Sequence, residues 1–493
     1  MTIQLIDQLT DRSLLKTQSY INGQWVDANS SSTFDVVDPA TEVVIASVAN
    51  LGAEQTREAI EIADKAQRIW RKEAPKTRSD ILERWYNLII ENTEDLAIIM
   101  SAEQGKSLAE SRGEIGYSAS FIKWFAEEGK RVYGDVIASP QTDRRGIAIR
   151  QAVGVVAAIT PWNFPSAMIT RKAGPALAVG CSIVLKPAAE TPLSALALAE
   201  LADRAGIPAG LFNVVCGDDA VAIGGELTSN KIVKKLTFTG STPVGKILMS
   251  QCANTVKRTS MELGGNAPVI IFDDADLDIV IPGIMSAKFR NSGQTCISAN
   301  RILVQKGIAA EFTKRLEESI QSFCFGAYSD AKSTHGPLIT AKAASNIDIK
   351  VQEAIANGAN LVCGGKLNDG KGYFYPATIL TGLNSNMAIF KEEIFGPVAA
   401  VYEFETEEQA VDMANDTDFG LASYVYTESM RRSWRVSESL EYGMVGVNET
   451  AISSEVIPFG GVKESGQGRE GSKYGLDDYL EIKYICFGAM NRD

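Results

Sequence analysis

Cys296 has a local sequence unlike that of a typical structural cysteine. It lies in NSGQTCISANR (291–301), among small and amide-bearing residues, whereas the other six cysteines are compatible with buried structural positions among hydrophobic neighbours. A cysteine acts as a nucleophile when its thiol becomes a thiolate, helped by backbone N–H groups or by a base. From this segment alone, a structural thiol and a nucleophile are both open.

Glu262 is the candidate general base. In MELGGN (261–266) it precedes Gly264 and Gly265, and the strand-like run PVIIF follows. A carboxylate on a mobile, glycine-flanked backbone can reach and activate a water molecule. The alternative interpretation is an exposed turn glutamate.

The single histidine, His335, restricts the chemistry further. A histidine-based triad or a poly-histidine metal site would have to be built around this one residue. Its neighbours, STHGP, predict a turn and a solvated loop histidine. We therefore expect a carboxylate base and no metal site.

Asn163 is a candidate oxyanion donor. The segment TPWNFP (160–165) directly follows a predicted strand and places Pro161 and Pro165 on either side of Asn163. Two prolines fix the backbone, so the side-chain amide can be held still and donate to a negatively charged oxygen. A simple turn between a strand and a helix would also use Pro and Asn, but the order Pro-Trp-Asn-Phe-Pro favours function.

A nucleotide site is predicted at FTGSTPVG (238–245), which follows a strand and opens a helix. Backbone N–H groups at a helix start, with the Ser241 hydroxyl, suit a phosphate. Lys186 ends another predicted strand and could bind the ribose or its 2′-phosphate. A G-x-G-x-x-G pattern at 466–471 is interpreted as a loop, because no strand precedes it and few residues follow to form a β-α-β unit.

These segments fall within an alternation of strands and helices between residues 150 and 275. The predicted strands are VGVVAAI, SIVLKP, FNVVCG, KKLTFTG and PVIIFDD, and the predicted helices between them are ITRKAGPALAVG, LSALALAELADRAG and TPVGKILMSQC. This order predicts β-α-β units and a mainly parallel sheet, which binds ligands at the carboxyl ends of its strands.

The remaining chain predicts further layers. Residues 53–73 and 77–133 have mostly helical periodicity, and a second alternation has strands near NRILVQ, PVAAVYEF, LASYVYT and MVGVN. Segments 143–151 and 477–488 have strand character outside both alternations, so each could be an edge strand that pairs with a partner chain.

Composition excludes several classes of protein. The 493 residues, 45% hydrophobic and 22% charged, predict two or three globular domains. A net charge of −13 opposes binding to nucleic acid or to anionic membranes. The N-terminal segment lacks the features of a signal peptide, no apolar stretch is long enough for a membrane span, and the odd, scattered cysteines include no C-x-x-C pair. We expect a cytoplasmic protein with free thiols.

Taken together, the motifs resemble the aldehyde dehydrogenase superfamily over nearly the whole chain. PWNFP, FTGSTPVG, MELGGNAP, GQTC, EEIFGP and PFGGVKESGQGRE occur in the family's order and near its usual spacings. The resemblance implies a Rossmann-like nucleotide-binding domain (1–134 and 153–264), a second α/β catalytic domain (265–472) and a small β oligomerisation extension (135–152 and 473–493). It also implies a homo-oligomer, either a dimer or a tetramer.

The resemblance also assigns roles to residues. Cys296 matches the nucleophile, Glu262 the general base, Asn163 the oxyanion donor and Lys172 a lysine near the active site. Water is then the expected acceptor of the thioester, because relatives that use coenzyme A generally lack this glutamate. The implied cofactor contacts are Thr160, Pro161, Trp162, Lys186, Ala189, Gly240, Ser241, Glu393 and Phe395.

Within the superfamily, NFPSAMITRKAGPALA, KFRNSGQTC and the segment 442–475 resemble the succinate-semialdehyde dehydrogenase branch. That branch holds a substrate carboxylate with two arginines and a serine, which match Arg171, Arg290 and Ser453. Guanidinium groups suit a carboxylate because each offers paired donors. Glutarate semialdehyde, one methylene longer, differs by only about 1–3 kcal/mol in such a pocket and stays an alternative.

Two positions depart from the pattern of many relatives. Ser298 stands where a second cysteine can form a regulatory disulfide, so no such local switch is expected. Ala189 replaces a glutamate that repels the 2′-phosphate in relatives that prefer NAD, which favours NADP with NAD also usable. Two other classes remain as alternatives, a catalytically silent relative and a cysteine hydrolase. The combination of Cys296, Glu262 and Asn163 argues against the silent relative, and the nucleotide motifs favour a redox enzyme over a hydrolase.

Overall fold

The computed structural model describes residues 4–491, and its first large sheet is mainly parallel. The strand order is β2-β1-β9-β8-β7-β10-β11-β21, with parallel pairing from β9 to β11 and antiparallel pairing at both edges. The bounds are β1 Ser19–Ile21, β2 Gln24–Val26, β7 Val155–Ile159, β8 Ser182–Lys186, β9 Phe212–Val214, β10 Val233–Thr239, β11 Arg258–Glu262 and β21 Gly466–Gln467.

Helices cover both faces of this sheet. Alternate residues of β7 point to opposite sides: Val156 and Ala158 join a core with helices α2 to α6, while Val155 and Ala157 join a core with α1, α7 and α8. The strands are therefore apolar on both faces. The helices are α1 Ala53–Trp70, α2 Pro75–Glu91, α3 Thr93–Gln104, α4 Leu108–Glu128, α5 Ala167–Val179, α6 Pro192–Arg204, α7 Ala220–Ser229 and α8 Thr242–Ala253.

A second large sheet has the order β14-β15-β16-β13-β12-β18-β19 and is parallel except for the pair β14–β15. Its strands are β12 Ala267–Ile271, β13 Ala299–Gln305, β14 Asn360–Cys363, β15 Thr378–Thr381, β16 Val398–Phe404, β18 Ala422–Tyr426 and β19 Met444–Val447. The accompanying helices are α9 Leu277–Phe289, α10 Ala309–Ile320, α11 Ala341–Ala356, α12 Ala388–Lys391, α13 Glu407–Asn415 and α14 Met430–Ser439. The α/β class with two parallel-sheet layers is thus confirmed.

One strand was assigned to the wrong alternation. PVIIF, predicted to continue the first alternation, forms β12 in the second sheet, while β11, with the polar sequence RTSME, occupies the place beside β10 in the first. The polar residues of β11 hide its strand character, although its last three residues are buried. The chain crosses between the sheets directly after Glu262, through the two glycines.

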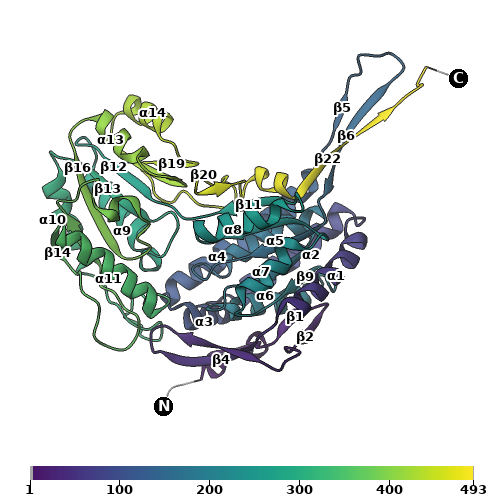
Figure 1. Cartoon of the computed structure of the whole chain (residues 1–493), viewed down its shortest axis with the longest axis horizontal. Helices are drawn as coiled ribbons and strands as arrows, with labels where there is room; N and C mark the ends of the chain where they lie inside the picture. The colour runs from purple at the N-terminus through teal and green to yellow at the C-terminus, as the bar shows by residue number, and fades with distance from the viewer. Residues whose placement is uncertain (1–3, 492–493) are drawn as a thin grey trace.

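The two strand-like segments outside the alternations pair with each other. β22 (Leu480–Phe487) runs antiparallel to β6 (Arg145–Ala152), and β5 (Asp135–Ile137) completes an arm that projects from the body (Figure 1). Val136, Ile482 and Tyr484 on this arm are 87%, 71% and 61% exposed. Smaller pairs are β3 (Thr33–Asp38) with β4 (Val43–Ala49) and β17 (Phe419–Gly420) with β20 (Val462–Lys463).

Two further expectations need correction. His335 lies in a loop, but it is half-buried rather than solvated, because its ring packs 3.7 Å from that of Phe323. Cys486 is exposed on β22 and so has no structural position in a core; all seven cysteines are free thiols. Within residues 4–491, none of the helices combines the length and apolar character that crossing a bilayer requires.

Candidate active site

Cys296 follows a strained turn between α9 and β13. Asn291, Ser292 and Gly293 take φ values of 51°, 53° and 75°, three successive left-handed conformations. Such conformations cost a non-glycine residue about 1–3 kcal/mol and persist only where neighbours enforce them. A Cβ at position 293 would lie 2.2 Å from the carbonyl oxygen of Gly396, so only glycine fits this contact. The turn is therefore fixed against the segment that carries Phe395.

Two cavities meet at Cys296, one of about 330 Å³ and one of about 260 Å³. Phe164 and Met168 line both, and they separate the two spaces. The larger cavity brings together the three predicted carboxylate ligands, Arg171, Arg290 and Ser453. The smaller one is lined by the predicted residues Pro161, Trp162, Asn163, Gly240, Ser241, Glu393 and Phe395.

The remaining predicted cofactor residues lie further along the same strand ends. The Thr160 N–H donates to the carbonyl of Lys186 at 3.1 Å, which joins the ends of β7 and β8. Burial lowers the pKa of Lys186, and its Nζ is 3.3 Å from the carbonyl of Pro187. Ala189 is half-buried three residues later. These residues are not among those that line the smaller cavity.

The surroundings of Cys296 favour the neutral thiol over the thiolate. Burial raises its pKa to about 12, and the charges of Glu262 and Glu393 act in the same direction, against Arg171 and Arg290. The nucleophilic thiolate therefore requires transfer of a proton to a base.

Glu262 ends β11 and is 3% exposed, so it is not the exposed turn glutamate that was the alternative. Neither carboxylate oxygen has a hydrogen-bond partner within residues 4–491. Burial, together with the charge of Glu470, raises its pKa well above the ordinary value, while Arg171 and Lys172 oppose the rise. A Cβ at Gly265 would lie 2.3 Å from the carbonyl oxygen of Cys296, so this segment passes directly against the backbone of the cysteine.

Glu470 is a site residue that the sequence did not reveal. Lys172 donates to its Oε1 and also, at 2.7 Å, to Thr239 Oγ1, while Nε of Arg171 lies 2.8 Å from Glu470 Oε2. Burial raises the pKa of Glu470, but the two cations outweigh it and hold the pKa below its usual range. The antiparallel pair β11–β21 places Glu262 opposite Gly466 and so brings this segment to the site. The only signal was its position in the motif PFGGVKESGQGRE, which carried no role for the glutamate.

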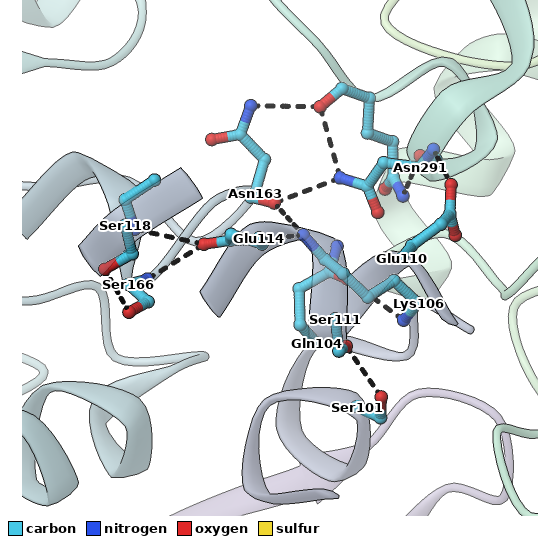
Figure 2. A network of polar contacts seen from close by, with 12 residues as sticks. Ser101, Gln104, Lys106, Glu110, Ser111, Glu114, Ser118, Asn163, Ser166 and Asn291 are labelled. Carbon is cyan, nitrogen blue, oxygen red and sulfur yellow. Dashed lines mark hydrogen bonds and ion pairs between the residues drawn. The ribbon is translucent and has the colours of Figure 1, made fainter. Parts of the chain in front are cut away.

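Asn163 faces the loop of the cysteine. Its Nδ2 donates to the carbonyl of Gln294 at 2.9 Å, two residues before Cys296 (Figure 2). The ring of Trp162, the preceding residue, meets that of Phe395 edge to face at 5.6 Å. The amide is therefore held beside the nucleophile by its own contacts and by those of its neighbours.

The larger cavity combines cations, hydroxyls and aromatic rings. The guanidinium of Arg171 lies between the rings of Phe121 and Phe459, at 4.9 and 4.3 Å, and its Nη2 has no hydrogen-bond partner within residues 4–491. The hydroxyls of Ser453 and Tyr117 are 2.5 Å apart. Arg290 is exposed, with its guanidinium 5.3 Å from the ring of Phe164.

Tyr117 was not predicted as a site residue, because an aromatic residue within a helical sequence pattern usually indicates a position in the hydrophobic core. Its hydroxyl lies in the larger cavity beside that of Ser453. A free guanidinium donor and two hydroxyls in one cavity suit an anionic group on a small ligand.

The smaller cavity suits a nucleotide. Ser241 precedes α8 directly after β10, and its side chain forms no capping bond, which leaves the helix start open to an anion. Glu393 Oε1 accepts from the N–H of Gly265 at 3.0 Å, and burial raises the pKa of this carboxyl to about 7. Phe395, with φ at 55°, holds a strained backbone conformation at the cavity wall. These residues fit a dinucleotide whose phosphates lie at α8.

Two α/β layers with a cysteine at the junction of an anion-binding cavity and a nucleotide cavity define a class of oxidoreductase. The family model "Aldehyde dehydrogenase family" matches residues 25–485. The chain belongs to the aldehyde dehydrogenase family.

Among its relatives, a glutarate-semialdehyde dehydrogenase of Pseudomonas aeruginosa is 55% identical over 98% of this chain and 100% of its own. A succinate-semialdehyde dehydrogenase [NADP(+)] of Escherichia coli is 54% identical over the same shares of the two chains. A crystal structure described as an NADP-dependent enzyme of E. coli superposes with a TM-score of 0.96 at 54% identity, covering 97% of this chain and 100% of the other. The fold predicted from sequence is that of this family.

Proposed function

We propose that the protein oxidises a short, carboxylate-bearing aldehyde to the acid, with succinate semialdehyde as the substrate and NADP as the acceptor. The observation that carries this proposal is the larger cavity, which has Cys296 in one wall and Arg171, Arg290 and Ser453 in others. An aldehyde with a carboxylate a few bonds away can place its carbonyl group at Cys296 and its carboxylate at the arginines and the serine. Relatives whose names specify succinate and glutarate semialdehyde support the same class of substrate.

The reaction follows from the residue types. The sulfur of Cys296 forms a bond to the aldehyde carbon, its proton passes to a base, and the new oxyanion accepts hydrogen bonds from Asn163 Nδ2 and the N–H of Cys296. Nicotinamide, when bound, accepts the hydride that leaves this carbon. The thioester that remains is hydrolysed by a water from which Glu262 removes a proton, and the C–S bond breaks to release the acid and restore Cys296.

Glu262 has the environment that this role requires. Its buried carboxylate has no hydrogen-bond partner within the described residues, and its raised pKa makes it a stronger base than an exposed glutamate. Glu470, held by Lys172 and Arg171, stays ionised beside it and contributes to that raised pKa. In this proposal Lys172 acts on the base in two ways: its own charge lowers the pKa of Glu262, and by keeping Glu470 ionised it supports the opposite effect.

Glutarate semialdehyde is the second candidate. It differs by one methylene, and a pocket discriminates such a group by only about 1–3 kcal/mol. The 55% identity to a glutarate-semialdehyde dehydrogenase is the specific observation in its favour. We place succinate semialdehyde first because the segments around Arg171, Arg290 and Ser453 resemble that branch.

NADP is the proposed cofactor, with NAD also accepted. Ala189 carries no charge where a carboxylate would repel a 2′-phosphate, and Lys186 at the end of β8 can attract one. The E. coli relative is named for NADP(+).

A homo-oligomer in the cytoplasm is also proposed. The exposed apolar residues of β5 and β22 on the projecting arm favour burial against another copy, so we propose residues 135–152 and 473–493 as the oligomerisation extension. Seven free thiols are compatible with a reducing compartment.

The test is a panel of four-carbon and five-carbon semialdehydes and uncharged aldehydes with NADP and NAD, followed by absorbance at 340 nm. We expect the semialdehydes to exceed the uncharged aldehydes in kcat/KM and Cys296→Ala to abolish turnover. Turnover in Cys296→Ala would overturn the mechanism, and equal rates with uncharged aldehydes would overturn the carboxylate site. Ester hydrolysis without any aldehyde oxidation would show a hydrolase, and no turnover of any kind a silent relative.

A further inference from the structure

The corner between α3 and α4 carries a buried ion pair at the edge of the substrate cavity. Lys106 and Glu114 are 2% and 4% exposed, and Nζ of Lys106 donates to Glu114 Oε2 at 2.5 Å. A buried charge is costly unless its hydrogen bonds are complete. The stability of this buried pair therefore depends on its other hydrogen bonds.

Both members of the pair bind the backbone around the oxyanion donor. Nζ of Lys106 also donates to the carbonyl of Asn163 at 2.8 Å (Figure 2). Glu114 Oε1 accepts from the N–H groups of Ser166 and Ala167, at 3.0 and 3.2 Å, at the start of α5. The segment from Asn163 to α5 is thus held at both ends by one ion pair.

The same corner also holds the turn before the nucleophile. Glu110 Oε1 accepts from the N–H of Asn291 at 2.6 Å, and Nδ2 of Asn291 donates to the carbonyl of Asn163 at 3.1 Å. The carbonyl of Asn163 therefore receives two donors, one from Lys106 and one from the turn that leads to Cys296 (Figure 2). The segment that carries the Asn163 amide and the turn that leads to the Cys296 N–H are therefore held by the same group of residues, Lys106, Glu110 and Glu114.

We infer that Lys106 is a positioning residue for the oxyanion site: by fixing the carbonyl of Asn163, it aims the side-chain amide of that residue at the oxygen of the reacting aldehyde. The inference rests on the proposed function, since it assumes the Cys296 mechanism. Its physical basis is that an oxyanion donor is effective only when it is already in place, because reorienting it during the reaction consumes the stabilisation it provides.

Lys106 lines the substrate cavity, so a direct role in binding the substrate carboxylate is the competing explanation. An ammonium group has three N–H donors. Two are directed to Glu114 and Asn163, and Nζ lies 4.3 Å from the centre of the Phe164 ring, where it has a cation–π contact. The Lys106 side chain is only 1% exposed, which favours positioning over direct binding of a ligand.

The test uses Lys106→Met, together with Lys106→Met/Glu114→Gln. The double variant removes both buried charges, so it can fold where the single variant leaves a carboxylate unpaired. Lys123→Met on α4, an exposed lysine paired with Glu83, is the matched control.

Three readouts separate positioning from binding and from general damage. Loss of one oxyanion donor lowers kcat about 10²–10³-fold, so we expect misplacement of Asn163 to lower kcat at least about tenfold with little change in KM. The loss in kcat should be equal for succinate semialdehyde and butanal. Hydrolysis of 4-nitrophenyl acetate without cofactor should fall by the same factor, because in all three reactions an oxyanion forms at the carbonyl group that Cys296 attacks. Alkylation of Cys296 by iodoacetamide, which forms no oxyanion, should keep its rate.

A raised KM for succinate semialdehyde with unchanged butanal oxidation would overturn the inference in favour of carboxylate binding. Equal loss of alkylation and turnover would overturn it in favour of a general structural role. Wild-type kinetics in a folded variant would also overturn it. Failure of the proposed function would appear separately: the wild-type enzyme would then show no aldehyde oxidation that depends on Cys296.

Discussion

Nε of Arg171 lies 2.8 Å from Oε2 of Glu470 in the interior, where the two side chains are 1% and 5% exposed. Because of this ion pair, Arg171 belongs both to the substrate cavity and to the group of charged residues around Glu262. Nε is within ion-pair distance of the Glu470 carboxylate, but neither Nε nor Nη2 forms a hydrogen bond within residues 4–491. Arg171 thus connects the proposed substrate-anchoring cavity to the network around Glu262.

The substrate anchor is best tested at Arg290, because removing Arg171 would also take away one of the two cations that pair with Glu470. Arg290→Met should lower kcat/KM for succinate semialdehyde by about 10–100-fold, the effect of losing a charged hydrogen bond worth about 1.5–3 kcal/mol. Oxidation of butanal should be unchanged, and Arg431→Met, at an exposed position, should behave as wild type for both aldehydes. An equal loss with butanal would mean that Arg290 supports the cysteine turn rather than the carboxylate.

Glu262→Gln should separate formation of the thioester from its hydrolysis. Because the glutamine can no longer take a proton from water, kcat should fall about 10²–10⁴-fold, while one equivalent of reduced cofactor still appears rapidly. Stopped-flow absorbance measures this burst, and mass spectrometry detects the acyl group on Cys296. Glu405→Gln, at an exposed glutamate paired with Lys306, is the control. Steady turnover at the wild-type rate would remove Glu262 from the mechanism.

Ala189→Glu should change the preference between the cofactors. A carboxylate near the 2′-phosphate would repel it, at a cost of about 1–3 kcal/mol, so kcat/KM for NADP should fall about 10–100-fold. NAD kinetics serve as the internal control and should change little. An equal loss with both cofactors would indicate damage to the packing of the half-buried Ala189 rather than discrimination.

Lys288 supplies a prediction about pH and stability. Its Nζ has no hydrogen-bond partner within residues 4–491, and burial lowers its pKa to about 7, with Glu393 opposing. The unfolded chain has a lysine pKa of about 10.4, so between about pH 7 and 10 it binds a proton that the folded protein does not. Stability therefore rises with pH through this range.

Lys288→Met removes this effect. The variant should unfold at a higher temperature than the wild type near pH 7, and the difference should shrink as the pH approaches about 10. Thermal unfolding followed by circular dichroism measures both, with Lys72→Met at an exposed position as the control. A difference that is constant with pH would show that the ammonium finds a partner.

The projecting arm predicts the outcome of surface substitutions. Ile482 and Tyr484 lie on one face of β22, because alternate residues of a strand share a face. Ile482→Lys/Tyr484→Lys should reduce the molecular mass measured by light scattering, while Lys483→Gln on the other face should not. An unchanged mass in the double variant would place the interface elsewhere.

The sequence predicted most of the frame of this site and less of its interior. Strand β7 is a continuous apolar run, and PWNFP and GQTC are local motifs, so periodicity and spacing identified them. Lys106, Glu110 and Glu114 have no comparable signal. Charged residues on a helix or in the loop before it usually face water, and only the tertiary fold brings these three against the segments of Asn163 and Asn291. Glu470 was missed for the same reason, since its partners are about 300 residues away in the chain.

The contact between Gly293 and Gly396 has a consequence for altering this protein by selection. The absence of a side chain at 293 lets the turn before Cys296 rest on the backbone that follows Phe395, with no intervening atoms. A substitution that shifts one of these loops must therefore be accompanied by a substitution in the other, so the two loops can change only together. Libraries intended to alter the range of aldehydes should keep both loops constant and vary the cavity wall on α4, at Gly113 and Tyr117.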